Sequence, residues 1–186
     1  MRILGLCGSL RAGSYNRQLL EAAGAVLPEG VRLTVFNTMA AVPPYNEDED
    51  TAEPPASVQQ LRDAIAQANA VLIATPEYNA SIPGQLKNAL DWASRPFRSC
   101  SLRDKPVAVI GASVSLFGAV WAQAELRKVL KTVGAHVIDM ELPVAQAHEA
   151  FTPDGELSQP ELEYRLQEVL ANLLAATAAG LVEQRA

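Results

Sequence analysis

The chain has 186 residues, of which 49% are hydrophobic and 19% charged, and its formal net charge is −6 at pH 7. This length and composition allow a domain with a sizeable core and exclude an intrinsically disordered chain. The negative charge provides no general attraction to nucleic acid or to an anionic membrane, and no apolar run approaches membrane-spanning length. With only Cys7 and Cys100 there is no disulfide framework, so we expect a cytoplasmic protein.

Short apolar runs alternate with amphipathic segments along the chain. The runs predict strands at 2–6, 32–36, 70–75, 107–111 and 136–139. The amphipathic segments predict helices at 16–27, 57–68, 83–92, 118–133 and 160–181. This alternation is typical of an α/β fold, a doubly wound parallel sheet with helices on both faces. No repeat or second domain is visible, so residues 1–186 are expected to form a single domain.

Two stretches interrupt the alternation. Residues 37–56 include an acidic run from Glu47 to Asp50, and we interpret this stretch as a solvated surface loop. A metal site there would need ligands converging from elsewhere, and the sequence indicates none. Residues 142–158 form a second segment without a regular pattern.

The loop after the first predicted strand is rich in groups that bind phosphate. Ser9, Ser14 and Asn16 offer side-chain donors, and Arg11 offers a guanidinium that can fork onto phosphate oxygens. The helix that follows directs the positive end of its dipole at this loop. The alternative is an ordinary strand-to-helix turn with a Ser or Asn cap.

The chain lacks the sequence fingerprints of the common nucleotide sites. Neither Gly-x-Gly-x-x-Gly nor Gly-Lys-Ser/Thr occurs. The second strand ends in Phe36-Asn37-Thr38, without the acidic residue that holds the ribose of a dinucleotide. A mononucleotide with one phosphate fits this loop better.

The loops after the third and fourth strands suit a flat polar ring. Pro76 stiffens the first of these loops, where Tyr78 offers an aromatic face. We expect Glu77 to shape that loop or to face solvent rather than to act as a general base. Small residues around Ser113 let backbone donors approach a ligand closely. No catalytic acid or base stands out in these loops.

These motifs resemble the NADPH-dependent FMN reductase family, which includes bacterial chromate, quinone and azo reductases. The resemblance runs from about residue 1 to residue 137. The matching pieces are Gly8-Ser9-Leu10-Arg11 with Ser14 and Asn16, Pro44-Tyr45-Asn46-Glu47-Asp48, Thr75-Pro76-Glu77-Tyr78-Asn79 with Ser81, Pro83-Gly84, Leu86-Lys87-Asn88-Ala89 and Asp91-Trp92, and Gly111-Ala112-Ser113. It implies a flavodoxin-like five-stranded sheet of order 2-1-3-4-5, bound FMN, and NADPH or NADH as co-substrate.

The resemblance also implies which residues contact the cofactor. The phosphate would be held by Ser9, Arg11, Ser14, Tyr15 and Asn16. The flavin ring would contact Pro76, Glu77, Tyr78 and Asn79, with Ser113 near its other polar edge. The chain departs from the family pattern at Ser115, where a Gly is usual, and at Gly118-Ala119, where Gly-Gly is usual.

The function expected from these features is an FMN-dependent reductase. Hydride would pass from NADPH through FMN to a small-molecule acceptor, such as a quinone, an azo compound, a metal or a flavin, by a ping-pong mechanism. The alternatives are a flavodoxin-type electron carrier and a regulatory nucleotide-binding domain. Carriers tend to be more acidic than this chain, in which 15 basic residues offset 21 acidic ones.

Two tryptophans predict self-association. Trp121 lies about 140° around its helix from Leu126, which belongs to the sheet-facing stripe. Trp92 is likewise rotated away from Leu86 and Leu90 in the preceding helix. Large aromatics on outer helix faces are enriched at interface cores, so we expect a homodimer or homotetramer with the flavin near the subunit boundary.

Overall fold

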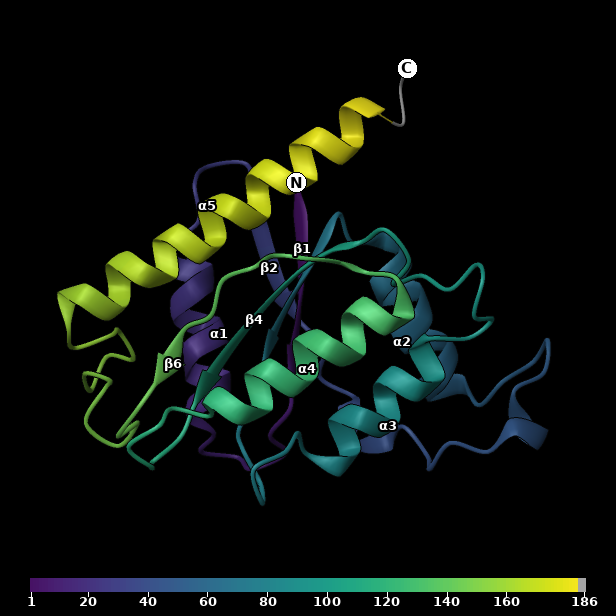
Figure 1. Ribbon diagram of the computed structural model, residues 1–186, viewed down its shortest axis with the longest axis horizontal. Helices are drawn as coiled ribbons and strands as arrows, with labels where there is room; N and C mark the ends of the chain where they lie inside the picture. The colour runs from purple at the N-terminus through teal and green to yellow at the C-terminus, as the bar shows by residue number, and fades with distance from the viewer. Residues whose placement is uncertain (184–186) are drawn as a thin grey trace.

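The computed structural model describes residues 1–183 and consists of a parallel sheet covered by helices on both faces (Figure 1). The five main strands follow the expected order, β2-β1-β3-β4-β5. Their bounds are Arg2–Cys7 for β1, Arg32–Val35 for β2, Ala70–Ala74 for β3, Pro106–Ala112 for β4 and His136–Val137 for β5. The helices are α1 (Tyr15–Ala25), α2 (Ala56–Gln67), α3 (Gly84–Ala93), α4 (Val120–Val133) and α5 (Pro160–Glu183).

Two separate hydrophobic layers hold the helices against the sheet. One layer contains side chains of α2, α3 and α4, and the other contains side chains of α1 and α5. In β3, Val71 and Ile73 belong to the first layer and Leu72 belongs to the second. Every residue of β3 and β4 is buried. The continuous apolar runs of these strands are therefore explained by burial on both faces.

A sixth strand lies where the sequence indicates only irregular structure. This strand, β6 (Pro143–Val144), pairs in parallel with Gly111 and Ala112 at the end of β4. β5 covers only the first two of the four predicted residues, and the chain then leaves β4 and rejoins it at β6. The buried side chain of Gln123 accepts a hydrogen bond from the Leu142 N–H just before β6. This detour supports the sheet edge from which the site loops emerge.

The 37–56 stretch is fastened to α3 along its first half, which corrects its interpretation as a solvated loop. Gln85 donates a hydrogen bond to the Met39 carbonyl at 2.8 Å. Asn88 donates to the Pro43 carbonyl at 2.8 Å and accepts from the Tyr45 N–H at 2.7 Å. Short 3-10 helices span Met39–Ala41 and Glu47–Glu49, and the second is the exposed acidic tip.

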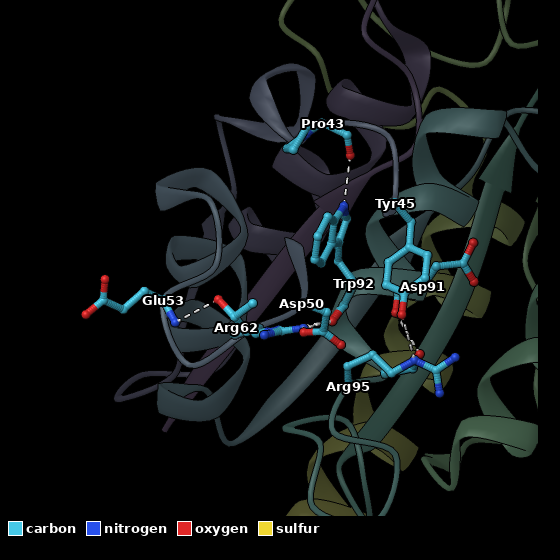
Figure 2. Close-up of polar contacts among 10 residues, drawn as sticks. Pro43, Tyr45, Asp50, Glu53, Arg62, Asp91, Trp92 and Arg95 are labelled. Atoms are coloured by element: carbon cyan, nitrogen blue, oxygen red, sulfur yellow. Dashed lines mark hydrogen bonds and ion pairs between the residues drawn. The ribbon is translucent and has the colours of Figure 1, made fainter. Parts of the chain in front are cut away.

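The predicted outward position of Trp92 is wrong (Figure 2). The side chain is fully buried, donates to the Pro43 carbonyl at 2.9 Å and packs edge-on against Tyr45. Arg62 lies over the indole, pairs with Asp50 at 2.7 Å and donates to the Trp92 carbonyl. Trp92 does point away from Leu86 and Leu90, but the 37–56 stretch covers the side of α3 on which it lies.

Trp121, in contrast, lies at the surface as expected, with 48% of its area exposed. Its ring centroid is 4.9 Å from that of Phe117, which is also exposed, as are Leu116 and Val114. We call Val114, Leu116, Phe117 and Trp121 the apolar patch. Among the helices of residues 1–183, none has the length and apolar character needed to cross a membrane.

Replacing Trp92 with phenylalanine tests the buried position of this side chain. The Trp92→Phe variant loses the hydrogen bond to Pro43 and part of the packed surface, so its free energy of unfolding should fall by about 1–2 kcal/mol. The loss stays modest because Asn88 still satisfies the Pro43 carbonyl. Urea unfolding followed by circular dichroism measures it.

The matched control is Tyr164→Phe, because Tyr164 is 58% exposed on α5. Its unfolding free energy should stay within about 0.5 kcal/mol of the original protein. Equal stabilities of the two variants would contradict the burial of Trp92.

Candidate functional site

The loops after β1, β3 and β4 meet around one cavity of about 180 Å³. Nine of the ten predicted site residues line it: Ser9, Arg11, Ser14, Tyr15, Asn16, Pro76, Glu77, Tyr78 and Ser113. Ala112 and Val114, the neighbours of Ser113 in the loop after β4, also line it. The carboxyl ends of β1, β3 and β4 lie at the lower side of Figure 1, away from the amino terminus. The cavity therefore lies at the sheet edge where ligands of parallel α/β folds bind.

The tenth predicted residue, Asn79, is outside the cavity lining. Tyr78 and Ser81 exchange two backbone hydrogen bonds, which makes Asn79 and Ala80 the centre of a two-residue turn. Their φ angles are 54° and 58°, as in a type I′ turn. Asn tolerates this conformation, whereas Ala adopts it at a cost of about 1–2 kcal/mol. Asn79 therefore turns the chain beside the cavity.

The start of α1 presents an anion-binding end to the cavity. Ser14 caps the helix, because its Oγ accepts a hydrogen bond from the Arg17 N–H at 3.3 Å. The first backbone N–H groups of the helix, at Tyr15 and Asn16, have no acceptor inside it. These donors and the positive end of the helix dipole favour a bound anion.

The side chain of Asn16, which was expected at the phosphate, is engaged by the backbone of Ala112. It is buried, its Nδ2 donates to the Ala112 carbonyl at 2.9 Å, and its Oδ1 accepts from the Ala112 N–H at 2.9 Å. Toward the carboxyl ends of the strands, the last backbone hydrogen bond that joins the β3 side to β4 runs from the Thr75 N–H to the Ile110 carbonyl. Beyond this point Asn16 takes the place of a neighbouring strand, and so ties the α1 loop to the end of β4.

Arg11 supplies a cation at the same end of the cavity. Its guanidinium carbon lies 5.1 Å from the centre of the Tyr15 ring. In the part of the chain that the structure describes, no carboxylate forms an ion pair with Arg11. Its charge is therefore available to an anionic ligand.

Glu77 connects the loop after β3 to α4. Its Oε2 accepts hydrogen bonds from the backbone N–H groups of Trp121 at 3.0 Å and Ala122 at 3.1 Å. The cap residue of α4, Ala119, has no side chain that could accept these bonds. A carboxylate is favourable at a helix N-terminus, so this contact holds the loop by capping α4 in place of a local residue.

The loop after β4 is held against β6 and the segment that follows it. The Ser113 N–H donates to the Val144 carbonyl, and the Ser113 carbonyl accepts from the Ala147 N–H, both at 3.0 Å. Gly118 has a φ of 58°, and a Cβ there would lie 2.6 Å from the Pro143 carbonyl carbon. Ala119 shares the left-handed conformation, with a φ of 62°. The second position of the Gly-Gly pattern is therefore left-handed here although it carries a Cβ.

A larger cavity of about 430 Å³ lies on the other side of the Arg11 loop. Phe36 and Met39 line it, and neither the loop after β3 nor the loop after β4 contributes to it. Arg11 lines both cavities. The second arginine of the larger cavity, Arg17, is already engaged by Glu21 at 2.9 Å and by Asn37 at 2.8 Å. The smaller cavity is the better candidate for a phosphorylated ligand, because it alone adds the start of α1 at Ser14 and Tyr15 and the loops after β3 and β4 to the free Arg11.

The described part of the chain has no cluster of metal-binding side chains. Within residues 1–183, no three His, Cys, Asp or Glu side chains come together as ligands. The ionisable side chains that line the smaller cavity are Arg11, Tyr15, Glu77 and Tyr78, and Glu77 is occupied by α4. This lining suits the binding and orientation of a ligand.

Comparisons with known proteins agree over most of the chain. A model of the NADPH-dependent FMN reductase family matches residues 1–149. An NAD(P)H-dependent FMN reductase of Pseudomonas aeruginosa is 38% identical over 174 residues, which cover 93% of each chain. A quinone reductase of Pseudomonas putida is 37% identical over 144 residues, which cover 77% of this chain and 73% of that one. The solved structure of a flavoenzyme NAD(P)H:(acceptor) oxidoreductase from Paracoccus denitrificans has a TM-score of 0.81 and 37% identity, covering 92% of this chain and 94% of that one.

The bond between Asn16 and Ala112 predicts a large stability effect. In Asn16→Ala, two buried backbone groups lose their partner, so the free energy of unfolding should fall by about 2–4 kcal/mol. The matched control is Asn172→Ala, because Asn172 is exposed on α5 and donates a single bond within its own helix. That change should stay within about 0.5 kcal/mol in urea unfolding. Equal effects of the two substitutions would refute the assigned role of Asn16.

Proposed function

Because this chain belongs to the NADPH-dependent FMN reductase family, we propose that its smaller cavity binds FMN and that the protein transfers electrons from NADPH or NADH to a small-molecule acceptor. When bound, FMN supplies the redox chemistry, since it takes hydride from the nicotinamide and passes it on. The extensive similarity to an FMN reductase and a quinone reductase supports this activity.

The single observation that carries the proposal is that two kinds of group line the cavity: phosphate donors near the start of α1, and the backbone of the loops after β3 and β4. One end has the free Arg11 guanidinium, the hydroxyls of Ser9 and Ser14 and the first N–H groups of α1. This donor set fits a phosphate dianion. The other end is bordered by the backbone of residues 76–78 and 112–114. A ligand with a phosphate at one end and a flat polar ring at the other matches both.

Each end has residues with a defined task toward the cofactor. Arg11, Ser9, Ser14 and the backbone at Tyr15 would hold the phosphate. Pro76 and Tyr78 would lie against the ring, and Ser113 would lie near its second polar edge. Glu77 acts through α4, and Asn16 acts through Ala112, so both set the positions of the groups that make direct contact.

The surroundings of the cavity favour a planar, weakly polar acceptor. Tyr78 and Val114 line the cavity and are more than half exposed. Leu116 and Phe117, which follow Val114 closely in the same loop, are also exposed. A quinone suits such a surface, and a relative named quinone reductase supports that choice. An azo compound, a free flavin or a metal complex needs only the same open ring face.

We also propose that the chain forms a homodimer or homotetramer. Trp92 does not support self-association, because its side chain is buried. Trp121 still supports self-association, together with the exposed Leu116 and Phe117. Since Val114 belongs both to the apolar patch and to the cavity lining, a second chain on this patch would border the flavin.

Removal of the Arg11 side chain tests the cofactor site. The loss of a charge-assisted contact of roughly 1.5–3 kcal/mol should weaken FMN binding about 10- to 150-fold in Arg11→Ala. Fluorescence titration of the apoprotein measures the dissociation constant. Arg17→Ala is the matched control, because Arg17 lines the larger cavity instead, and its affinity should stay unchanged. If Arg17→Ala weakened FMN binding and Arg11→Ala did not, the phosphate would have to bind in the larger cavity.

Steady-state kinetics test the shared ring face. If donor and acceptor bind to the same face in turn, double-reciprocal plots at several quinone concentrations should be parallel. Intersecting lines that persist across acceptors would indicate a ternary complex instead. Negligible NADPH oxidation by the FMN-loaded protein would favour an electron carrier over a reductase.

Sedimentation at micromolar protein concentration tests the assembly. We expect a species of two or more chains, and Trp121→Glu should shift it toward the monomer, because a charge would be buried in the interface. Tyr164→Glu places the same charge at another exposed aromatic, on α5, and should leave the assembly intact. A monomer with full reductase activity would reject the proposed interface.

A further inference from the structure

We propose that Phe151 is a positioning residue for the cofactor phosphate, because it holds Tyr15 and thereby Arg11 in the arrangement that binds FMN. This inference rests on the proposed function and adds a residue that the sequence motifs do not indicate. Phe151 lies just beyond residues 1–149, which the family model matches.

Tyr15 contacts both Phe151 and Arg11, and Tyr15 and Arg11 line the cavity. The rings of Phe151 and Tyr15 are nearly parallel, at 9°, with centroids 6.1 Å apart. The Arg11 guanidinium carbon lies 5.1 Å from the centroid of the same Tyr15 ring. A guanidinium can stack on an aromatic ring and still direct its N–H groups at a phosphate. The stack therefore orders Arg11 before the ligand arrives.

This ordering matters because Arg11 is otherwise unrestrained. The residue is exposed, and in the described part of the chain it has no carboxylate partner. A free arginine loses rotamer freedom when it binds, and that loss weakens the net interaction. A fixed Tyr15 ring reduces the loss, and Phe151 helps to fix that ring by stacking on it.

Phe151 is itself held by a small hairpin. It forms an antiparallel bridge with Leu157, and the intervening turn is closed by a bond from the Thr152 N–H to the Glu156 carbonyl at 2.8 Å. Leu157 is buried in the same hydrophobic layer as α1 and α5. The aromatic ring is thus attached to the core and is not a mobile surface group.

The same segment, residues 146–158, also reaches the ring end of the cavity. The Gln146 N–H donates to the Ser115 carbonyl, and the Ala147 N–H donates to the Ser113 carbonyl, both at 3.0 Å. This segment therefore contacts the loop after β4 through its backbone, and it contacts Tyr15 at the start of α1 through the Phe151 ring. This double contact explains why a residue outside the motifs bears on cofactor binding.

A comparison of FMN with riboflavin separates positioning from ordinary packing. Riboflavin lacks the phosphate, so it cannot use Arg11. We would measure the affinity of apoprotein for both flavins in the original protein, Phe151→Leu, Arg11→Ala and the double variant. Phe151→Leu should weaken FMN about 3- to 10-fold, as expected for a lost aromatic contact, and riboflavin less than twofold. In the double variant FMN should bind no more weakly than in Arg11→Ala.

Two further variants complete the test. Phe151→Tyr keeps the stacked ring and should restore the original ratio of FMN to riboflavin affinity, including where Phe151→Leu does not fold. Tyr164→Leu removes an exposed aromatic on α5 and should leave both affinities unchanged.

The inference fails if Phe151→Leu weakens both flavins equally, if the effects of Phe151 and Arg11 simply add, or if Phe151→Tyr changes the ratio. Failure of the proposed function looks different. In that case the original protein would not bind FMN more tightly than riboflavin, and Arg11→Ala would have no effect.

Discussion

The site depends on the pair of hydrogen bonds between the Asn16 side chain and the backbone of Ala112. β4 continues past the end of β3, so the buried N–H and carbonyl of Ala112 lack a strand neighbour on that side. Each buried group left unpaired would cost about 1–3 kcal/mol. Because Asn16 belongs to the first turn of α1, satisfying these groups also fixes the helix relative to the loop after β4. One side chain thereby sets the spacing between the two ends of the cavity.

The loops after β3 and β4 are likewise held by hydrogen bonds to neighbouring elements. Glu77 attaches the loop after β3 to the first N–H groups of α4, and Ser113 is bonded to β6 and Ala147. These contacts leave the cavity lined by backbone and by few ionisable side chains. Such a lining suits a bound cofactor that carries the chemistry, because the protein then has to orient it and to stabilise its charge.

Local patterns in the sequence predicted the features that depend on neighbouring residues. The alternation of strands and helices, the donor-rich loop and the ring loop are all visible within short windows, whereas the strand order followed from the family resemblance. The contacts between distant residues were not predictable. Asn16 was singled out as a phosphate ligand, but its bond to Ala112, 96 residues away, could not be seen in the sequence. The burial of Trp92 depends on the 37–56 stretch, and Phe151 lies in a segment with no periodic pattern.

The most direct test of this account is a crystal structure of the protein with FMN. We expect the phosphate to lie at the start of α1, within reach of Arg11, with the flavin ring between residues 76–78 and 112–114. The hydrogen bonds of Asn16 to Ala112 should be intact in that complex. A flavin bound in the larger cavity beside Phe36 and Met39, or a complex in which Asn16 has left Ala112 to bind the phosphate, would contradict the account.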